Sequence, residues 1–228
     1  MDTWLAPIML SLRIALVATA AVFFLGTGAA WVLVKRRPPG GRILDALFTL
    51  PLVLPPTVTG FLLLWLLGRH GPVGRLLHLA GAEVLFTWWA GVIASAVVAF
   101  PLMYNAAKAG LEGVDETLEK VARTLGASEA RVFLTVTLPL AWPGLGTGLV
   151  LSFVRALGEF GATLMVAGNI PGKTQTVATA VWAATETGDM RTATLLVGIM
   201  LIFGFAAVWA SRLGSEWGFG RHVQARRG

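Results

Sequence analysis

Residues 84–107 read VLFTWWAGVIASAVVAFPLMYNAA and contain no charged side chain. A helix needs about 20 mostly apolar residues to cross the roughly 30 Å of hydrocarbon in a bilayer, so this stretch predicts a membrane-spanning helix. The whole chain agrees: of its 228 residues 56% are hydrophobic and only 13% are charged, and the mean hydropathy is +0.74. Soluble domains carry about 25% charged residues. The composition therefore excludes a soluble enzyme, a nucleic-acid-binding domain and a disordered chain.

Four more uncharged apolar runs are long enough to span a membrane: residues 14–34, 46–67, 132–154 and 192–211. Residues 160–185 are also apolar, but the sequence PGK at 171–173 interrupts them, so we expect half-length, re-entrant or external pieces there. The first run is too long for a signal peptide, and RRPP at 36–39 follows it in place of a cleavage site. We expect an all-α, polytopic membrane protein with about five transmembrane helices and a single domain over residues 1–228.

Basic residues predict the orientation of the chain. It carries 18 Lys and Arg against 12 Asp and Glu, a net charge of +6. Two-thirds of the basic residues fall in three segments, which follow the first, third and fifth expected spans and therefore lie on the same side of the membrane. These residues are Lys35, Arg36, Arg37, Arg42, Lys108, Lys120, Arg123, Arg131, Arg212, Arg221, Arg226 and Arg227. Because cytoplasmic loops are enriched in Lys and Arg, we expect the amino terminus outside and the carboxyl terminus in the cytoplasm. The excess charge is then a topology signal, and we expect no nucleic-acid partner.

Residues 111–131, between the third and fourth spans, form the most distinctive loop. One apolar face of a short helix would hold four residues at helical spacing: Leu118, Val121, Ala122 and Leu125. Asp115 suits the amino-terminal end of that helix, Gly126 stands where it would stop, and Ser128 can cap a second short helix. Such a helix can dock into a groove on another protein or rest on the bilayer, and the pattern alone does not decide between the two.

The second apolar run contains FTLPLVLPPTVTG at residues 48–60. Pro51, Pro55 and Pro56 remove backbone donors and leave carbonyls without helical partners. A membrane tolerates such backbone only where protein or a water-filled cavity surrounds it. We therefore expect this span at the centre of the bundle; a merely kinked structural helix is the alternative.

The fourth span and the residues after it add two patterns. Gly144 and Gly148 are four apart and would allow another helix to approach closely. Residues 155–163 read RALGEFGAT, in which Arg155 and Glu159 can pair on one helix face. Ionisable side chains at membrane depth are costly and are functional candidates by default. Because Glu159 would repel an anion, we expect it to support a gate, with direct anion binding as the alternative.

The residues show no constellation for catalysis or metal binding. His70, His78 and His222 lie outside the expected spans, no facing Asp pair occurs within the spans, and Cys is absent. The glycine cluster at 144–148 lacks the Lys and Ser or Thr of a phosphate-binding loop. We therefore expect no catalytic residue, no metal site and no cofactor in this chain. A stand-alone channel or secondary transporter remains an alternative function.

The loop at 111–131 resembles the cytoplasmic signature loop of type I ABC importer permeases. In that pattern three residues separate a Glu-Ala-Ala triplet from a glycine. Nine further residues follow the glycine, and then come an aliphatic residue, any residue, Leu and Pro. Here Gly126 is followed at that spacing by VTLP at 136–139, while the triplet position reads KVA at 120–122 with Glu119 before it. Further matching stretches are LPLVLPPTVTG at 50–60, GRHGPVG at 68–74, GEFGAT at 158–163 and GNIPG at 168–172. Over about residues 7–212 the chain is similar to the molybdate ABC transporter permease family.

This resemblance implies a pore subunit of an ATP-driven molybdate importer in the bacterial cytoplasmic membrane, with tungstate or sulfate and thiosulfate as alternative cargoes. It implies a homodimer, two cytoplasmic ATPase subunits that bind ATP and Mg²⁺, and an extracytoplasmic oxyanion-binding protein. The residues expected to couple to the ATPase are Leu118, Glu119, Ala122, Leu125, Gly126 and Ala127. Those expected along the translocation pathway or its gate are Pro51, Pro55, Pro56, Thr57, Thr59, Gly60, Arg155, Glu159, Phe160, Gly161 and Thr163.

Overall fold

The computed structural model describes the backbone of residues 4–224 and the side chains of residues 4–209, and this part of the chain is helical with no β-strand. The elements in chain order are α1 (Leu5–Trp31), the π-helical turn η1 (Val32–Arg36), α2 (Gly41–Val53), α3 (Pro56–Leu67), α4 (Pro72–Leu79), α5 (Trp88–Glu112), α6 (Glu116–Thr124), α7 (Glu129–Val132), the π-helical turn η2 (Phe133–Thr137), α8 (Leu138–Leu157), α9 (Gly161–Ala167), α10 (Val177–Glu186) and α11 (Met190–Gln224). The arginines of the expected cytoplasmic tail, Arg212, Arg221, Arg226 and Arg227, lie outside the described side chains.

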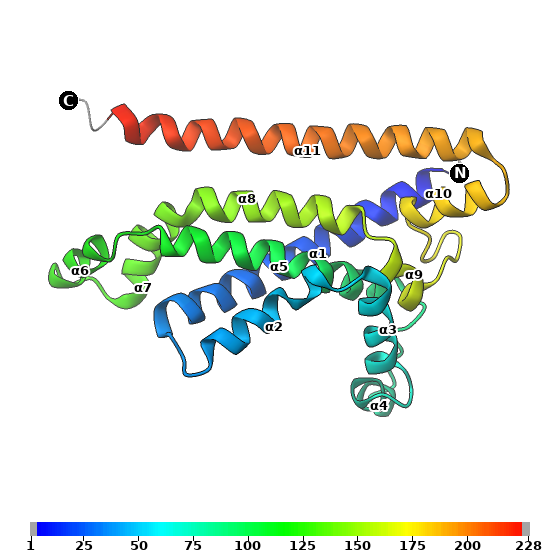
Figure 1. Cartoon of the computed structure of the whole chain (residues 1–228), viewed down its shortest axis with the longest axis horizontal. Coiled ribbons are helices and arrows are strands. Elements are labelled where there is room, and N and C mark those ends of the chain that lie inside the picture. Colours follow the sequence, from blue (N-terminus) through cyan, green and yellow to red (C-terminus); the bar gives the residue numbers. More distant parts are fainter. Residues whose placement is uncertain (1–3, 225–228) are drawn as a thin grey trace.

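Helices α1, α5 and α8 form the core of the bundle, and α11 runs along its outside (Figure 1). Glycines make the closest approaches between these helices. A Cβ on Gly144 would lie 2.8 Å from the Cα of Gly110 on α5, and one on Gly148 would lie 2.9 Å from the Cβ of Ala106. The close contact predicted for Gly144 and Gly148 is therefore confirmed, with α5 as the partner helix. Small residues let helix backbones meet in lipid, where packing drives association.

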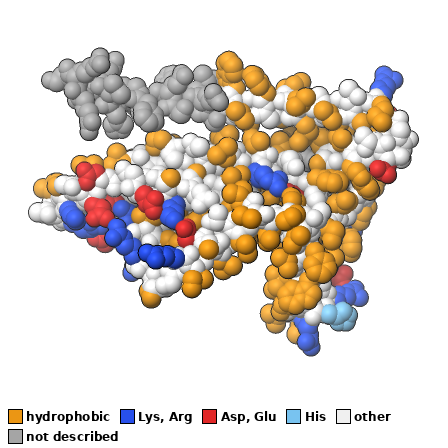
Figure 2. All heavy atoms as spheres, in the orientation of Figure 1, with side chains coloured by type: hydrophobic (Ala, Val, Ile, Leu, Met, Phe, Trp, Pro, Cys, Tyr) orange, Lys and Arg blue, Asp and Glu red, His pale blue; other side chains and the backbone are white. Residues whose placement is uncertain are grey.

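The helices confirm four of the five expected spans. Four are long and apolar enough to cross a membrane: Leu5–Arg36, Trp88–Glu112, Glu129–Leu157 and Met190–Trp209. Figure 2 shows most charged side chains at the ends of the molecule and at the tip that carries α4, with one small basic patch in the mainly uncharged surface between them. This distribution suits a protein that crosses a bilayer.

The remaining expected span, residues 46–67, is broken. The chain bends by 114° between α2 and α3. Leu54 and Pro55 have extended backbones with ψ of 137° and 139°, because the residue before a proline avoids the helical region. Pro56 then starts α3, where its missing N–H costs nothing. Together the two helices count as at most one broken or re-entrant span.

In the single chain, the expectation that this segment lies at the centre of the bundle fails for α2, whereas α3 buries Thr59, Gly60, Leu63 and Leu67. No residue of α2 is buried. The interior is already filled by α1, α5 and α8, so α2 lies against α5 at the edge and exposes its apolar side chains. Its one strong polar attachment is Asp45, whose Oδ1 accepts hydrogen bonds from Tyr104 and Lys108 of α5 at 2.5 and 2.7 Å.

Residues 160–185 form two short helices, α9 and α10, as the interrupted pattern predicts. Ser11 of α1 secures the start of α10, because the N–H of Val177 donates to its hydroxyl at 2.8 Å. The amide N–H of Phe86 donates to the carbonyl of Val166, which fixes α9 against the segment before α5. Helix α9 packs beside α3 at the end of the bundle opposite α6 (Figure 1).

Candidate functional site

The short helix predicted in residues 111–131 is α6, and its ends form as the sequence predicts. Asp115 caps its start, with the N–H of Thr117 donating to the carboxylate at 2.8 Å. Gly126 follows the helix with φ of +85°, the left-handed conformation that glycine adopts most easily. Ser128 caps α7, where the N–H of Arg131 donates to its hydroxyl at 3.4 Å. Local capping chemistry therefore sets the boundaries of this segment.

One face of α6 is apolar and uncovered in the single chain. Leu118 and Val121 are about half exposed, and Leu125 is 82% exposed. Ala122 and Ala127 are partly buried beside them. Helix α6 lies at one end of the bundle, beyond the long helices (Figure 1). An uncovered apolar ridge at this place suits a groove on a partner protein.

Glu119 lies on the opposite side of α6 and is only 3% exposed. Its Oε1 lies 2.8 Å from the Nζ of Lys35 in η1 and accepts a hydrogen bond from the hydroxyl of Thr137 in η2 at 2.6 Å. The structure therefore places this carboxylate inside the protein, although the resemblance implied that Glu119 couples to the ATPase together with the apolar residues of α6. Lys35 and Thr137 were missed because no local pattern pairs them with Glu119; their positions in two π-helical turns, which often mark functional sites, appear only in the structure.

The carboxyl group of Glu119 stays ionised at neutral pH. Burial raises its pKa, but hydrogen bonds from Lys35 and Thr137 and the positive charges of Lys35 and Arg123 outweigh burial and hold the pKa below its usual range. Arg123 extends the network, because its guanidinium donates to both oxygens of Glu129 at 2.6 and 3.1 Å. The network ties α6 to both neighbouring π-helical turns and to α7.

At the other end of the bundle, the structure brings the two halves of the expected pathway together. A Cβ on Gly60 of α3 would lie 2.9 Å from the Cα of Ala162 on α9, and one on Gly161 would lie 3.2 Å from the Cβ of Pro56. Residues far apart in sequence thus meet where α3 and α9 begin. The buried hydroxyls of Thr59 and Thr163 belong to these helices and have no hydrogen-bond partner within the described part of the chain.

The pair predicted between Arg155 and Glu159 is present. The Nη1 of Arg155 lies 2.8 Å from Oε2 of Glu159, whose side chain is almost fully buried. The other oxygen, Oε1, accepts the N–H of Ala162 at 2.8 Å. Glu159 therefore also caps α9, a role that the sequence did not suggest. Because its two oxygens serve two elements, this side chain links the end of α8 to α9.

The other expected pathway residues lie apart from this junction or at its rim. Pro51 is partly buried within α2, and Pro55 is exposed in the break between α2 and α3. Thr57 is exposed on the first turn of α3. Phe160 packs against Trp182 of α10, with ring centres 6.2 Å apart. The structure thus unites α3 with α9 and leaves the first half of the broken span separate.

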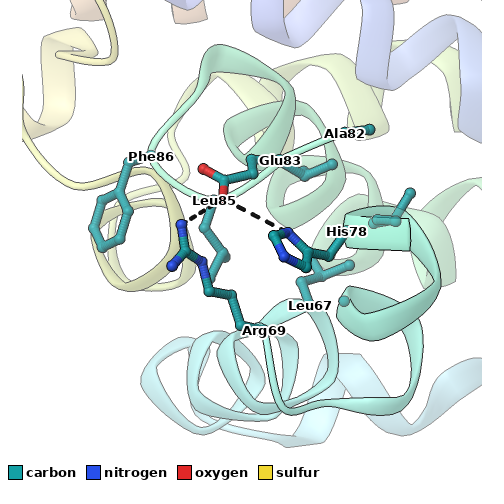
Figure 3. A pocket seen from close by; sticks show the side chains of 10 residues that line it. Leu67, Arg69, His78, Ala82, Glu83, Leu85 and Phe86 are labelled. Carbon is teal, nitrogen blue, oxygen red and sulfur yellow. Dashed lines mark hydrogen bonds and ion pairs between the residues drawn. The ribbon is translucent and has the colours of Figure 1, made fainter. Parts of the chain in front are cut away.

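A pocket of about 300 Å³ lies beside α4, between the end of α3 and the segment before α5 (Figure 3). Glu83 points toward two basic groups at its mouth: the Nη2 of Arg69 donates to Oε1 of Glu83 at 2.6 Å, and the Nδ1 of His78 lies 3.9 Å from the same oxygen. Leu67 and Phe86 form part of its apolar wall. All three polar side chains are exposed, so this contact holds a surface loop in place. No group of three His, Asp or Glu within the described residues is arranged to hold a metal ion.

Comparison with known proteins gives one consistent result. Residues 22–214 match the family described as "Binding-protein-dependent transport system inner membrane component". The chain is 47% identical over 200 residues to the "Putative molybdenum transport system permease protein YvgM" of Bacillus subtilis (strain 168), covering 87% of this chain and 88% of that one. It is 43% identical over 215 residues to the "Molybdenum transport system permease protein ModB" of Escherichia coli (strain K12), covering 92% and 94%. Among solved structures, a chain of the MetNI methionine ABC transporter in an inward-facing conformation superposes with a TM-score of 0.74 at 15% identity, covering 94% of this chain and 95% of that one, and so shares its fold.

Proposed function

This chain belongs to the family of binding-protein-dependent transport system inner membrane components, and from that premise we propose that it forms the translocation pathway of an ATP-driven molybdate importer. It is a multi-pass membrane protein with the fold of a type I ABC transporter permease. The names of its relatives in Bacillus subtilis and Escherichia coli support molybdate as the cargo. Tungstate or sulfate are the alternative oxyanions, and the bacterial inner membrane is the proposed location.

The pathway would lie between two copies of this chain. The exposed apolar side chains of α3, together with Leu52 and Val53 at the end of α2, support this proposal, because a second copy would cover surface that the single chain leaves open. An uncovered face of this kind normally marks an interaction site or lipid contact. The expectation that the broken span is central would then hold for the dimer, although it fails for α2 in the single chain.

Two cytoplasmic ATPase subunits would bind ATP and Mg²⁺, each holding the apolar ridge of one α6. The observation that carries the proposal is the arrangement of α6: Leu118, Val121 and Leu125 face outward, while Glu119 fastens the helix from behind. A force applied to the exposed side would pass through Lys35 to α1 and through Thr137 to α8. An ATPase that closes on ATP could thereby rearrange the bundle.

At the opposite end, an extracytoplasmic binding protein would deliver the oxyanion. The junction of α3 and α9 supports a gate there, because Glu159 links α8 to α9 and Gly161 packs against α3. Arg155 would offset the charge of Glu159 that otherwise repels an anion. Selectivity would reside mainly in the binding protein, so the pathway itself needs only a weak, transient site.

Copurification tests the assignment. The tagged chain should pull down its cognate ATPase, and Leu125→Asp on α6 should abolish this association. Leu79→Asp on α4 is the matched control, because Leu79 is 84% exposed at the other end of the molecule, as Leu125 is on α6. The docking assignment would be contradicted if both variants kept the ATPase, or if both lost it. Transport by the chain without any ATPase would instead favour a channel or secondary transporter.

A further inference from the structure

The elbow between α1 and α2, which we define as residues 35–43, carries an open groove of about 550 Å³. Arg37 and Arg42 line it together with the apolar side chains of Leu33 and Ile43. Arg37 has φ of +43° and ψ of 56°, a left-handed backbone that turns the chain from η1 toward α2. The groove therefore sits where two apolar helices reach the polar end of the bundle.

The elbow carries more positive charge than the rest of the chain neutralises. Residues 35–42 contain four basic side chains and no acidic one. Lys35 is engaged by Glu119, and Arg37 lies 3.3 Å from Glu116 with both side chains exposed to solvent. An exposed pair of this kind contributes little and is easily exchanged for another anion. Within the described residues, no ion pair engages Arg36 or Arg42, and Arg36 lies over the ring of Trp31 at 5.6 Å.

An apolar strip continues from the groove along α2. Ile43, Leu47 and Leu50 fall at i, i+4 and i+7 on one helix face and are all exposed, Ile43 by 75%. A cationic groove that opens onto an apolar strip matches a ligand with an anionic head and hydrocarbon chains. Inorganic phosphate, or an acidic surface of a protein, would satisfy the arginines and leave the strip uncovered.

We propose that this groove binds an anionic phospholipid. The phosphate lies between the guanidiniums of Arg37 and Arg42, and the acyl chains run along Ile43, Leu47 and Leu50. Basic pockets between membrane helices are a known way to hold anionic head groups. The site requires only that the chain resides in a bilayer, so it goes beyond the proposed transport activity and does not depend on the cargo.

Lipid retention provides the test. The purified full-length chain is reconstituted with equal amounts of phosphatidylcholine and phosphatidylglycerol, extracted gently, and the lipids that remain bound are counted by native mass spectrometry. Wild type should retain phosphatidylglycerol preferentially. In the double variant Arg37→Gln/Arg42→Gln the preference for phosphatidylglycerol should fall about 30-fold, as expected for two basic residues at an anionic surface. The matched control is Arg69→Gln/Arg75→Gln, which removes the same charge near α4 and should keep the preference.

The other outcomes separate the remaining occupants. Equal losses in both double variants would show general charge attraction and overturn the site, as would equal retention of the two lipids by wild type. Displacement of phosphatidylglycerol by a large excess of inorganic phosphate would identify a phosphate site without a lipid requirement and would also overturn it. If Arg37→Gln/Arg42→Gln keeps its lipid but, in a parallel copurification, loses its cognate ATPase, the groove is a protein contact and the lipid site is overturned. Leu47→Ser provides a second variant that keeps every charge, and it should weaken retention of phosphatidylglycerol.

Discussion

Glu119 of α6 and Lys35 of η1 form a largely buried ion pair with 2.8 Å between Oε1 and Nζ. The same oxygen accepts a hydrogen bond from Thr137 in η2 at 2.6 Å. One carboxylate thus joins α6, the proposed coupling helix, to η1 at the end of α1 and to η2 at the start of α8. The exposed side of α6 remains open for a partner, so attachment and docking use opposite faces of one short helix.

Replacing Glu119 by Gln should loosen α6. The amide can still accept from Thr137, but the charge that holds Lys35 is lost and that ammonium stays largely buried. We expect amide hydrogen exchange across residues 116–124 to rise about tenfold, since a charged hydrogen bond contributes on the order of 1.5 kcal/mol. Glu112→Gln is the control, because Glu112 is exposed and forms no ion pair within the described residues. Equal exchange in both variants would remove Glu119 as an anchor.

Acid should release the same helix. Because the folded-state pKa of Glu119 is lowered, its stabilising contribution is fully present above the unfolded-state value of about 4.3 and is lost as pH falls through the folded-state value. Protection of α6 against hydrogen exchange should therefore hold from neutral pH to about pH 5 and decline below it. The decline should be shallower in Glu119→Gln, where the carboxylate of Asp115 remains. An identical acid profile in wild type and variant would show that the carboxylate does not titrate with folding.

Gly126→Val should uncouple ATP hydrolysis from uptake. A Cβ at Gly126 would meet no atom within 4 Å, but φ of +85° is strained for a branched residue by about 1–2 kcal/mol. We expect normal amounts of protein in the membrane and persistent ATP hydrolysis, with uptake reduced about tenfold. Gly126→Asn is the matched control, because Asn tolerates the left-handed region, and it should transport nearly as wild type does. Normal uptake by Gly126→Val would count against a coupling role.

Glu159→Gln should change the rate of uptake more than the apparent affinity. The variant keeps an acceptor for the N–H of Ala162 and loses the charge that pairs with Arg155. Glu159→Ala removes both, and it should in addition lower stability by about 1 kcal/mol, the usual cost of a lost helix cap. Initial uptake rates measured over a range of substrate concentrations separate a change in the maximal rate from a change in the apparent affinity. Unchanged rates in Glu159→Gln would remove Glu159 from the gate.

Local chemistry in the sequence was enough to predict much of this fold. Uncharged apolar runs predicted four continuous spans because bilayer thickness sets a minimum helix length. Asp115, Gly126 and Ser128 predicted the limits of two short helices because capping involves only neighbouring residues. Arg155 and Glu159 were paired correctly for the same reason, since they are one helical turn apart.

The features that the sequence did not predict depend on tertiary contacts. The prolines of residues 51–56 indicated an irregular span and account for the break between α2 and α3, but the edge position of α2 depends on its packing against α5. Lys35 and Thr137 become partners of Glu119 only after the bundle forms. The capping of α9 by Glu159 was also missed, although it is a local contact between residues three apart, because the interrupted pattern of residues 160–185 did not show where a helix begins.

Uptake of radiolabelled molybdate into proteoliposomes tests whether this chain forms the pathway of an ATP-driven molybdate importer. The vesicles would contain this chain with its cognate ATPase, and the binding protein would be added outside. We expect accumulation that requires ATP inside the vesicles and the binding protein outside, and that excess unlabelled molybdate suppresses. Accumulation that proceeds without ATP, or no molybdate uptake by a complex that hydrolyses ATP and transports another solute, would contradict this assignment.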